Sequence, residues 1–325
     1  RTWGRGEDFS EAHSLPRRAP RAQPHGNVMG RRRTEYFRPP LAFARPACYT
    51  EGMITDIHTH STFSADGRSP LPEMLARAAE LGAAYYGVSE HFDYDYEADG
   101  VLAEGKQVPL IDAEAYFPAA RALQREYAPR MRVLVGGEFG YTPTQSATNR
   151  YLTIIETFRP DFVVNSVHTV DGYDPWFAEY FAGKTRREAY ARYLERVRAS
   201  LDAPYPYDIV AHIGYVGRNA PYPAPTALRY EECPELLDDI LRTIVKKGKI
   251  LEVNSSARQA GDFLPGTDIL ARYFALGGRK VSFASDAHGV EQICARRDIV
   301  CAALKAIGFT HITVPDCGRE IFVPL

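Results

Sequence analysis

The sequence lacks the features that would assign it to several common classes of protein. It contains no run of about 18 apolar residues, so no segment is predicted to span a membrane. Its five cysteines are odd in number and form no Cys-x-x-Cys pair, which argues against a disulfide framework and a zinc knuckle. A Gly-x-Ser-x-Gly elbow and a glycine-rich phosphate loop are also missing. With no apolar signal core near its start, we expect a soluble, cytoplasmic protein.

An excess of charge of one sign is also missing, because the formal net charge is only −2. This balance favours neither nucleic acid nor a membrane as a partner of the whole chain. The charge is unevenly placed, however. Residues 1–52 contain ten Arg, no Lys and five acidic residues, a net charge of +5 that leaves −7 for residues 53–325. The negative charge of residues 53–325 is consistent with bound cations.

Residues 1–52 combine clustered Pro and Arg with no sustained hydrophobic periodicity, which predicts a disordered basic extension. Three interpretations of this segment stay open: a basic arm for nucleic acid, a transit peptide, or residues that are not part of the native protein because translation begins at Met53. We favour the last. The folded domain is then expected over residues 53–325.

From Met53 onward, strand-like and helix-like segments alternate without an internal repeat. Seven short apolar runs have the length of strands: 54–58, 85–89, 133–138, 162–167, 209–212, 250–254 and 281–285. Helical patterns separate them, at about 70–81, 112–127, 144–158, 186–201, 232–247, 267–276 and 291–307. This α/β rhythm predicts parallel strands with right-handed crossovers. We expect a closed TIM-like barrel, with an open doubly wound sheet as the alternative.

Metal-binding side chains stand at the ends of these strands. In the segment His58-Thr59-His60, the two imidazoles are two residues apart and lie on the same side of an extended chain. Other apolar runs also end in His, Asp or Glu, and together they supply His91, Glu138, His168, His212, Asp286 and His288. A closed barrel brings the carboxyl ends of its strands together. The sequence therefore predicts a cluster of divalent metal ions at those ends.

Two acidic residues are assigned with different reasoning. Asp66, in Asp66-Gly67, is read equally well as an ordinary turn residue or as a ligand near His60. Glu138 ends its strand, and a carboxylate can bridge two cations where an imidazole binds one, so we assign it the bridge. The mixed imidazole and carboxylate donors suit zinc, iron or manganese.

In order and spacing, these motifs resemble the polymerase and histidinol phosphatase (PHP) superfamily, and most of all its monofunctional histidinol-phosphatase branch. The resemblance covers about residues 53–325. It implies a distorted (β/α)7 barrel with three metal ions. It also implies their ligands: His58, His60, Glu138 and Asp286 for the first ion, Glu138, His168 and His212 for the second, and Asp66, His91 and His288 for the third. Ser89-Glu90-His91 departs from the Thr-Asp-His of many relatives.

The resemblance also implies hydrolysis of L-histidinol phosphate to L-histidinol and phosphate, a step of histidine biosynthesis, by a metal-bound hydroxide in the trinuclear site. Clustered cations suit this chemistry because they acidify bound water and neutralise phosphoryl oxygens. Arg218 and Arg258 are the candidates for holding the phosphate, although Arg258 comes one residue earlier than in relatives. Asp286 and His288 could protonate the leaving alkoxide, with Glu138 as the third catalytic residue.

Two rival functions stay open. One is a phosphoesterase of the same superfamily that acts on a phosphoprotein, a nucleotide or a sugar phosphate. The other is a metal-binding module without catalysis. The acidic, aromatic segment 92–97, expected to be a loop, could contact the ammonium and imidazole of histidinol or could only face solvent. The oligomeric state is not indicated.

Overall fold

A computed structural model describes residues 53–325 except 103–104, 106 and 257–262. The expectations for residues 1–52 therefore lie outside the described residues, as does Arg258. The parallel strands are β1 Ile54–Asp56, β2 Ala83–Phe92, β3 Arg132–Gly140, β4 Val163–Ser166, β5 Ile209–Val210, β6 Ile250–Asn254 and β7 Val281–Ala284. The helices are α1 Leu71–Glu80, α2 Tyr94–Asp99, α3 Ala113–Tyr127, α4 Gln145–Phe158, α5 Arg186–Ser200, α6 Pro234–Lys247, α7 Thr267–Ala275 and α8 Arg297–Ile307.

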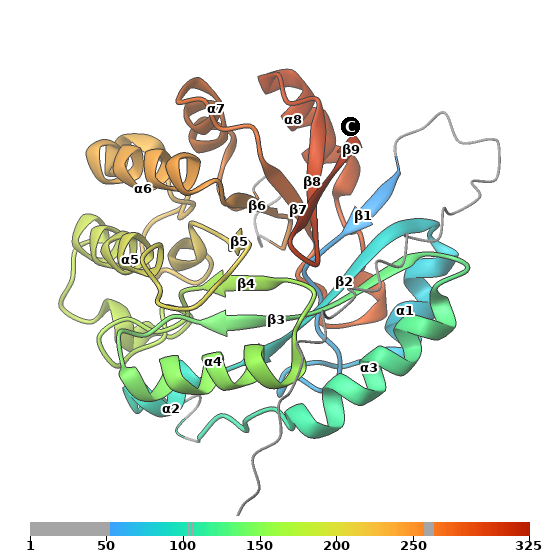
Figure 1. Cartoon of the computed structure of the whole chain (residues 1–325). Coiled ribbons are helices and arrows are strands. Elements are labelled where there is room, and N and C mark those ends of the chain that lie inside the picture. Colours follow the sequence, from blue (N-terminus) through green and yellow to red (C-terminus); the bar gives the residue numbers. More distant parts are fainter. Residues whose placement is uncertain (1–52, 103–104, 106, 257–262) are drawn as a thin grey trace, which may run out of the picture. The chain divides into compact units, whose positions relative to one another are not determined.

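The seven parallel strands pair in chain order from β1 to β7, and helices lie outside them (Figure 1). The sheet also closes on itself where the chain leaves β1 and along the last residues of β7. There the backbone N–H of Ile57 donates to the carbonyl of Phe283 at 3.2 Å, and the N–H of Asp286 donates to the carbonyl of His58 at 2.9 Å. A parallel bridge between Thr59 and Ala287 continues this contact. The prediction of a distorted seven-stranded barrel is confirmed.

Helix ends follow the local sequence. Pro70 precedes α1, where its fixed φ suits the start of a helix. At α5, Thr185 and Glu188 form a capping box, in which each side chain bonds the backbone N–H of the other residue. Gly248 ends α6 in the left-handed conformation that glycine adopts without steric cost. These signals explain why the predicted helix bounds mostly agree with the observed ones.

The chain ends in a two-stranded antiparallel hairpin, β8 His311–Asp316 and β9 Arg319–Pro324, which the sequence analysis did not predict. Val314 and Val323 of this hairpin are fully buried. They pack in one apolar cluster with side chains of the barrel strands, including Leu134, Phe162 and Ile250. The hairpin therefore adds to an apolar layer that is separate from the core between helices and strands.

Gly136 shows how tightly this layer is packed. A Cβ atom on Gly136 would lie 2.5 Å from the ring of Phe162, and one on Gly87 would lie 2.9 Å from the same ring. Strands β2 and β3 thus each have a glycine at the position where the ring of Phe162 lies. On β3, the residues on the same side of the strand run Leu134, Gly136, Glu138, so the side chains change from apolar to acidic toward the carboxyl end.

The segment 92–97 is not the loop that we expected. Strand β2 extends to Phe92, and α2 begins at Tyr94. Asp95 of this helix is fully buried, and Glu97 pairs with Arg150 at 2.6 Å on the surface. Burial of one face stabilises a short helix that its acidic composition does not suggest.

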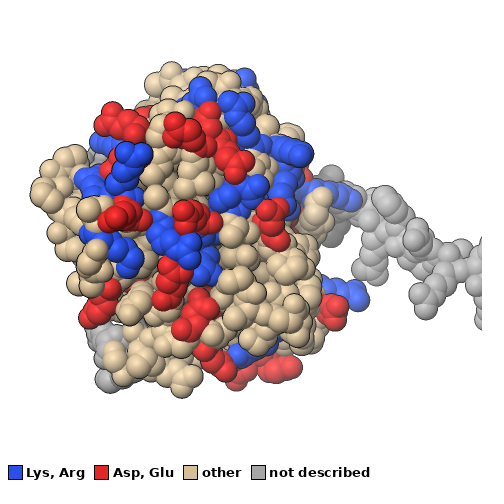
Figure 2. Space-filling view, turned by 90° about the vertical axis from the view of Figure 1, so that its left-hand side faces the viewer, with Lys and Arg blue, Asp and Glu red and all other residues tan. Residues whose placement is uncertain are grey.

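The outer face that includes α5 and α6 carries interspersed acidic and basic side chains (Figure 2). Ion pairs join α6 to α5 and to the turn that follows it: Arg198 of α5 pairs with Asp239 at 2.6 Å, and Lys247 pairs with Asp202, just after α5, at 2.6 Å. Such exposed pairs contribute little to stability. In the part of the chain that the structure describes, no helix is both long and apolar enough for a membrane span.

The apolar layer inside the barrel can be tested with one buried and one exposed phenylalanine. Replacing Phe162, which is 1% exposed, by Ala should lower the free energy of unfolding by about 3–5 kcal/mol because it leaves a cavity. Replacing Phe322, which is 54% exposed on β9, by Ala should change it by less than about 0.5 kcal/mol. Urea denaturation followed by circular dichroism measures both; equal effects would show that the layer is not packed as described.

Candidate metal centre

His58 and His60 follow β1 in extended chain, and both side chains are fully buried. The alternation of residues along this segment places both imidazoles on the inner side. The hydrogen bond from the N–H of His60 to the carbonyl of Ala287, at 2.8 Å, joins this segment to the end of β7. Closure of the barrel is therefore what brings the first and last predicted ligands together.

Glu138 lies at the centre of the site, on β3, and is 1% exposed. Its Oε1 lies 3.1 Å from Nε2 of His168 and 3.0 Å from Nε2 of His212. The hydroxyl of Ser166 also donates to this oxygen. His168 and His212 follow β4 and β5, the next strands around the barrel, so one side of the carboxylate faces these two imidazoles.

The other oxygen of Glu138 faces three different imidazoles. Its Oε2 lies 3.1 Å from Nε2 of His58, 3.5 Å from Nε2 of His60 and 3.0 Å from Nδ1 of His91. His91 is directly opposite Glu138 in the register of β2 and β3. The two oxygens thus lie beside separate groups of imidazoles. This arrangement suits a carboxylate that bridges two cations.

Asp286 completes the group around His58 and His60. Its Oδ1 lies 3.3 Å from Nε2 of His60 and 3.9 Å from Nε2 of His58. The residue has a φ of +54°, a left-handed conformation that Asp tolerates better than most residues. On its other side, Oδ2 accepts a hydrogen bond of 2.8 Å from Nη2 of Arg218. Despite burial, Arg218 and His60 hold the pKa of Asp286 well below its usual value.

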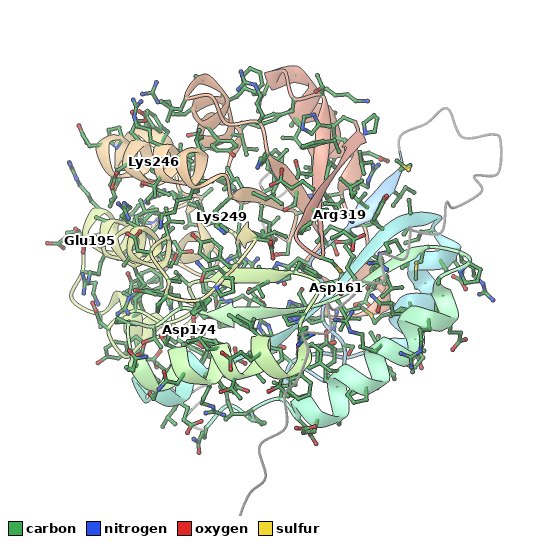
Figure 3. The ribbon with its side chains drawn as sticks, viewed as in Figure 1. Asp161, Asp174, Glu195, Lys246, Lys249 and Arg319 are labelled. Atoms are coloured by element: carbon green, nitrogen blue, oxygen red, sulfur yellow. The ribbon has the colours of Figure 1, made fainter. Side chains whose placement is uncertain are left out.

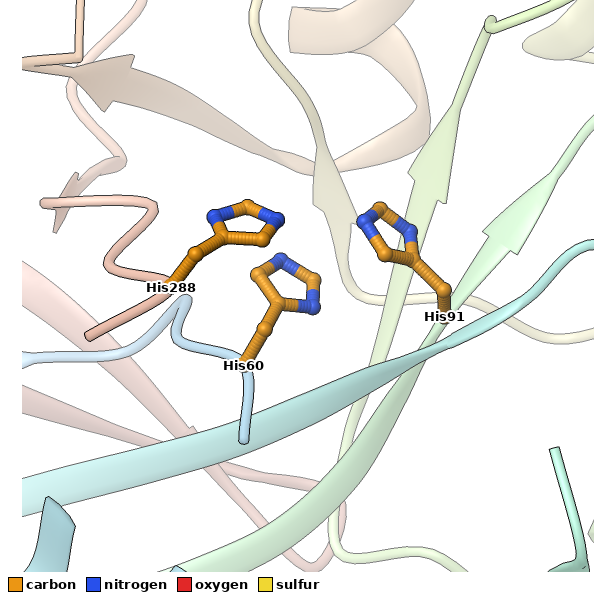
Figure 4. Close-up of side chains that lie close together, drawn as sticks. All are labelled: His60, His91 and His288. Carbon is orange, nitrogen blue, oxygen red and sulfur yellow. The ribbon is translucent and has the colours of Figure 1, made fainter. Parts of the chain in front are cut away.

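A third group of imidazoles lies toward the outside of the site. The rings of His60 and His288 stack with centroids 4.3 Å apart, and those of His60 and His91 stack at 4.1 Å (Figure 4). Asp66 lies beside this group, with its Oδ2 3.0 Å from Nε2 of His288 and its Oδ1 3.7 Å from Nε2 of His91. Its side chain is 61% exposed, unlike the other donors.

The donor atoms of the site are better satisfied by cations than by hydrogen bonds to one another. Several are buried and have no hydrogen-bond partner: Nε2 of His58, His60 and His288, Nδ1 of His91 and Oε2 of Glu138. Buried polar atoms without partners are costly, and so is a buried carboxylate among imidazoles. Divalent cations would satisfy the nitrogen lone pairs and the carboxylate charge together.

The protonation behaviour of two imidazoles agrees with this fit. Burial, together with the neighbouring His91 and His288, lowers the pKa of His60 well below its usual value. Burial also lowers the pKa of His212. Both rings are therefore neutral at pH 7, the form in which imidazole binds a metal ion.

The structure brings all nine predicted metal ligands into one region. Donor atoms within 4.8 Å of one another form the groups His58, His60 and Asp286, then Glu138, His168 and His212, and then His60, His91 and His288. The first two match the first two predicted ligand sets, with Glu138 contacting both. The third differs from the predicted set in containing His60, with Asp66 beside it.

Arg218 also lies at the site, after β5. Its Nη2 contacts Asp286, the side-chain oxygen of Asn254 at 3.2 Å and the hydroxyl of Ser256. Part of the guanidinium is thus committed to fixing Asp286. Its Nε is buried without a hydrogen-bond partner.

Sequence reasoning missed two buried glutamates. Glu252, in the middle of β6, contacts Nδ1 of His58 at 2.6 Å. Glu90 accepts hydrogen bonds from the hydroxyls of Ser61 and Ser64, each at 2.5 Å, and so fixes the segment that follows His60. A Glu inside an otherwise apolar run was the available signal for Glu252, and the Glu directly before His91 was the signal for Glu90.

Asp93 is a third acidic residue at the site, placed where β2 gives way to α2. Its Oδ1 lies 3.8 Å from Nδ1 of His91 and 4.0 Å from Nδ1 of His168. With these two imidazoles it forms a further group of possible ligands. Of the acidic residues in segment 92–97, only Asp93 has a carboxylate within 4.0 Å of a predicted ligand in the described contacts.

Three comparisons bear on this arrangement. Residues 56–256 match the family described as PHP domain. A histidinol-phosphatase from Lactococcus lactis is 28% identical over 240 residues, which are 72% of this chain and 83% of that protein. Among solved structures, the histidinol phosphate phosphatase of L. lactis complexed with zinc, L-histidinol and phosphate has a TM-score of 0.72 at 25% identity, covering 82% of this chain and 98% of that one. A structure from Listeria monocytogenes, 23% identical, shows the same fold with a TM-score of 0.66 over 75% of this chain and 99% of that one.

The central position of Glu138 leads to a test. In Glu138→Gln, one carboxylate oxygen becomes an amide that cannot bind a cation, so metal affinity should fall by about 100-fold or more. The exposed Glu97→Gln is the control, because the ion pair of Glu97 within the described residues is with Arg150 on the surface. Elemental analysis after gel filtration measures metal per chain, and thermal unfolding checks the fold. A full metal content in folded Glu138→Gln would contradict the central role of this carboxylate.

Proposed function

Since the chain belongs to the PHP domain family, we propose that it hydrolyses L-histidinol phosphate to L-histidinol and phosphate. It is a metal-dependent phosphoric monoester hydrolase by its donor set and its similarity to histidinol-phosphatases. The observation that carries the proposal is the division of imidazoles between the two oxygens of Glu138. The extent of the match to a relative solved with histidinol and phosphate supports the substrate.

We propose three divalent ions, with Glu138 shared by two of them. His58, His60 and Asp286 would hold the first with Glu138, His168 and His212 the second, and His91, His288 and Asp66 the third. When bound, such ions lower the pKa of water and neutralise phosphoryl oxygens. Zinc is favoured by the solved relative, and iron and manganese suit the same donors.

Arg218 has two tasks in this proposal. Through Nη2 it fixes Asp286, and its remaining N–H groups are available to a phosphate oxygen. A guanidinium has five donors, so one residue can serve both. Arg258 stays a candidate for a second phosphate contact. Of the two candidates for proton donation to the leaving alkoxide, Asp286 is held ionised beside Arg218, so the role is assigned to His288, whose side chain is 20% exposed against 5% for Asp286.

Asp93 is proposed as the residue that receives the substrate's ammonium group. Its carboxylate lies next to the imidazoles of His91 and His168, and its side chain is 10% exposed. Asp174, after β4, is labelled in Figure 3. It is less available, because it accepts hydrogen bonds from Tyr96 at 2.7 Å and Tyr215 at 3.0 Å. A buried carboxylate discriminates in favour of a cationic substrate, since phosphate esters without an amine leave it unpaired.

The rivals differ from this proposal in what they predict. A phosphoesterase for nucleotides, sugar phosphates or phosphoproteins has no need of a carboxylate for an ammonium group beside the site. A metal-binding module without catalysis has no need of Arg218 beside the donors. The small-molecule substrate is also consistent with the cytoplasmic location that we propose.

Steady-state kinetics tests the substrate. We expect kcat/KM for L-histidinol phosphate to exceed that for sugar phosphates, nucleoside monophosphates and a phosphotyrosine peptide by about 100-fold or more. A preference of that size for another ester would refute the substrate and leave the metal centre standing. No hydrolysis of any ester by the zinc-loaded protein would favour the rival without catalysis.

A variant of Asp93 tests recognition of the amine. Asp93→Asn should reduce kcat/KM for histidinol phosphate by about 10–100-fold, the effect of losing a charge-assisted hydrogen bond. Hydrolysis of para-nitrophenyl phosphate, which has no amine, should change less than threefold, as should both activities of Glu97→Gln. Equal losses on both substrates would mean that Asp93 serves the metal centre instead.

A further inference from the structure

Strand β6 supplies none of the predicted metal ligands, yet its inner face carries two polar side chains with no exposed surface. Glu252 and Asn254 are both 0% exposed. They follow Ile250 at intervals of two and so lie on the side of the strand that faces the apolar layer lower down. A buried carboxylate in this position needs compensation from its surroundings.

Glu252 makes three contacts in the described structure, and in two of them it is the acceptor. Its Oε2 contacts Nδ1 of His58 at 2.6 Å. Its Oε1 accepts from the backbone N–H of His212 at 3.0 Å and from the amide of Asn254 at 2.9 Å. A carboxylate satisfies the two donors on Oε1 and leaves Oε2 to accept from the ring of His58 when the ring proton is on Nδ1.

The contact with His58 determines which nitrogen of that ring is free. A carboxylate at 2.6 Å from Nδ1 requires the proton there, because an unprotonated nitrogen would face an acceptor. In the neutral ring, the form that binds a cation, the lone pair is then on Nε2, which lies 3.1 Å from Oε2 of Glu138 and has no hydrogen-bond partner. Nε2 is thus left in the form that binds a metal ion.

The contact with His212 reaches the opposite group of ligands. His212 faces Oε1 of Glu138, whereas His58 faces Oε2. Glu252 therefore fixes the ring of a ligand on one side of the bridge and the backbone of a ligand on the other. Asn254 extends the network, since its amide also donates to Oδ2 of Asp286 at 3.2 Å.

We propose that Glu252 is a positioning residue that holds His58 in its metal-binding tautomer and keeps the two groups of ligands in register. This inference rests on the metal centre of the proposed function, and it does not depend on the identity of the substrate. It also gives β6 a part in the site through hydrogen bonds, without ligation.

Glutamine at this position shows why charge is needed. In Glu252→Gln, the amide N–H2 must face either Nδ1 of His58 or the pair of donors from His212 and Asn254. Facing His58, it moves the ring proton to Nε2 and blocks metal binding there. If the amide N–H2 faces the N–H of His212 and the amide of Asn254, three donors meet without an acceptor.

The test compares zinc binding by the unmutated protein, Glu252→Gln and Asp161→Asn. Asp161 is the matched control, because it is 7% exposed, accepts the backbone N–H of Val135 at 2.8 Å and precedes β4 at the opposite end of the strands (Figure 3). Titration against a chromophoric chelator gives the affinities, and 15N NMR of the histidine rings gives the tautomers. Thermal unfolding checks that each variant is folded.

We expect Glu252→Gln to bind at least one zinc ion about 10–100-fold more weakly than the unmutated protein in either orientation of the amide, with the proton of His58 moved to Nε2 when the amide faces that ring. Asp161→Asn should match the unmutated protein in both readings. If Glu252→Gln does not fold, Glu252→Asp, which keeps the charge but shortens the side chain, should show the same loss of affinity. Unchanged affinity and tautomer in a folded variant would overturn the inference. Absence of zinc from the unmutated protein would refute the metal centre and this inference together, whereas a different substrate preference would refute neither.

Discussion

A single buried carboxylate, that of Glu138, is the constraint on which the rest of the site depends. Both of its oxygens lie within 3.5 Å of imidazole nitrogens, and the side chain is 1% exposed. Burial would raise the pKa of Glu138, but positive charge beside it, supplied without a cation by the protonated imidazoles of His58 and His168, holds it well below its usual value. A charged carboxylate in such a place requires cations around it, and the imidazoles that surround it are ligands that bind them.

The barrel provides this arrangement by bringing together strand ends that are far apart in the sequence. His58 and Asp286 are separated by more than two hundred residues, yet the N–H of Asp286 donates to the carbonyl of His58 at 2.9 Å. Below the polar layer, Phe162 and the valines of the β8–β9 hairpin fill the apolar layer. The same strands therefore carry a packed apolar part and a polar end, which lets the core hold the donors rigidly.

Much of this site could be predicted from sequence because it follows from the period of a strand and the closure of a barrel. Those two rules place His91, Glu138 and His212 at strand ends on the same side of the barrel. They do not identify Glu252, because hydrogen bonds to His58 and His212 depend on side-chain positions that no periodicity records. Helix α2 was missed because burial of Asp95 and its neighbours stabilises it, and local composition does not. The hairpin after α8 was missed because its strands are defined by packing against the barrel.

Anomalous X-ray diffraction from crystals of the metal-loaded protein, collected at the zinc, iron and manganese edges, tests the account most directly. We predict one peak between Glu138 and His212, a second between Glu138 and His58, and a third near His288. Each should lie about 2.0–2.3 Å from the donor atoms. No peak within coordination distance of either oxygen of Glu138 would contradict the account.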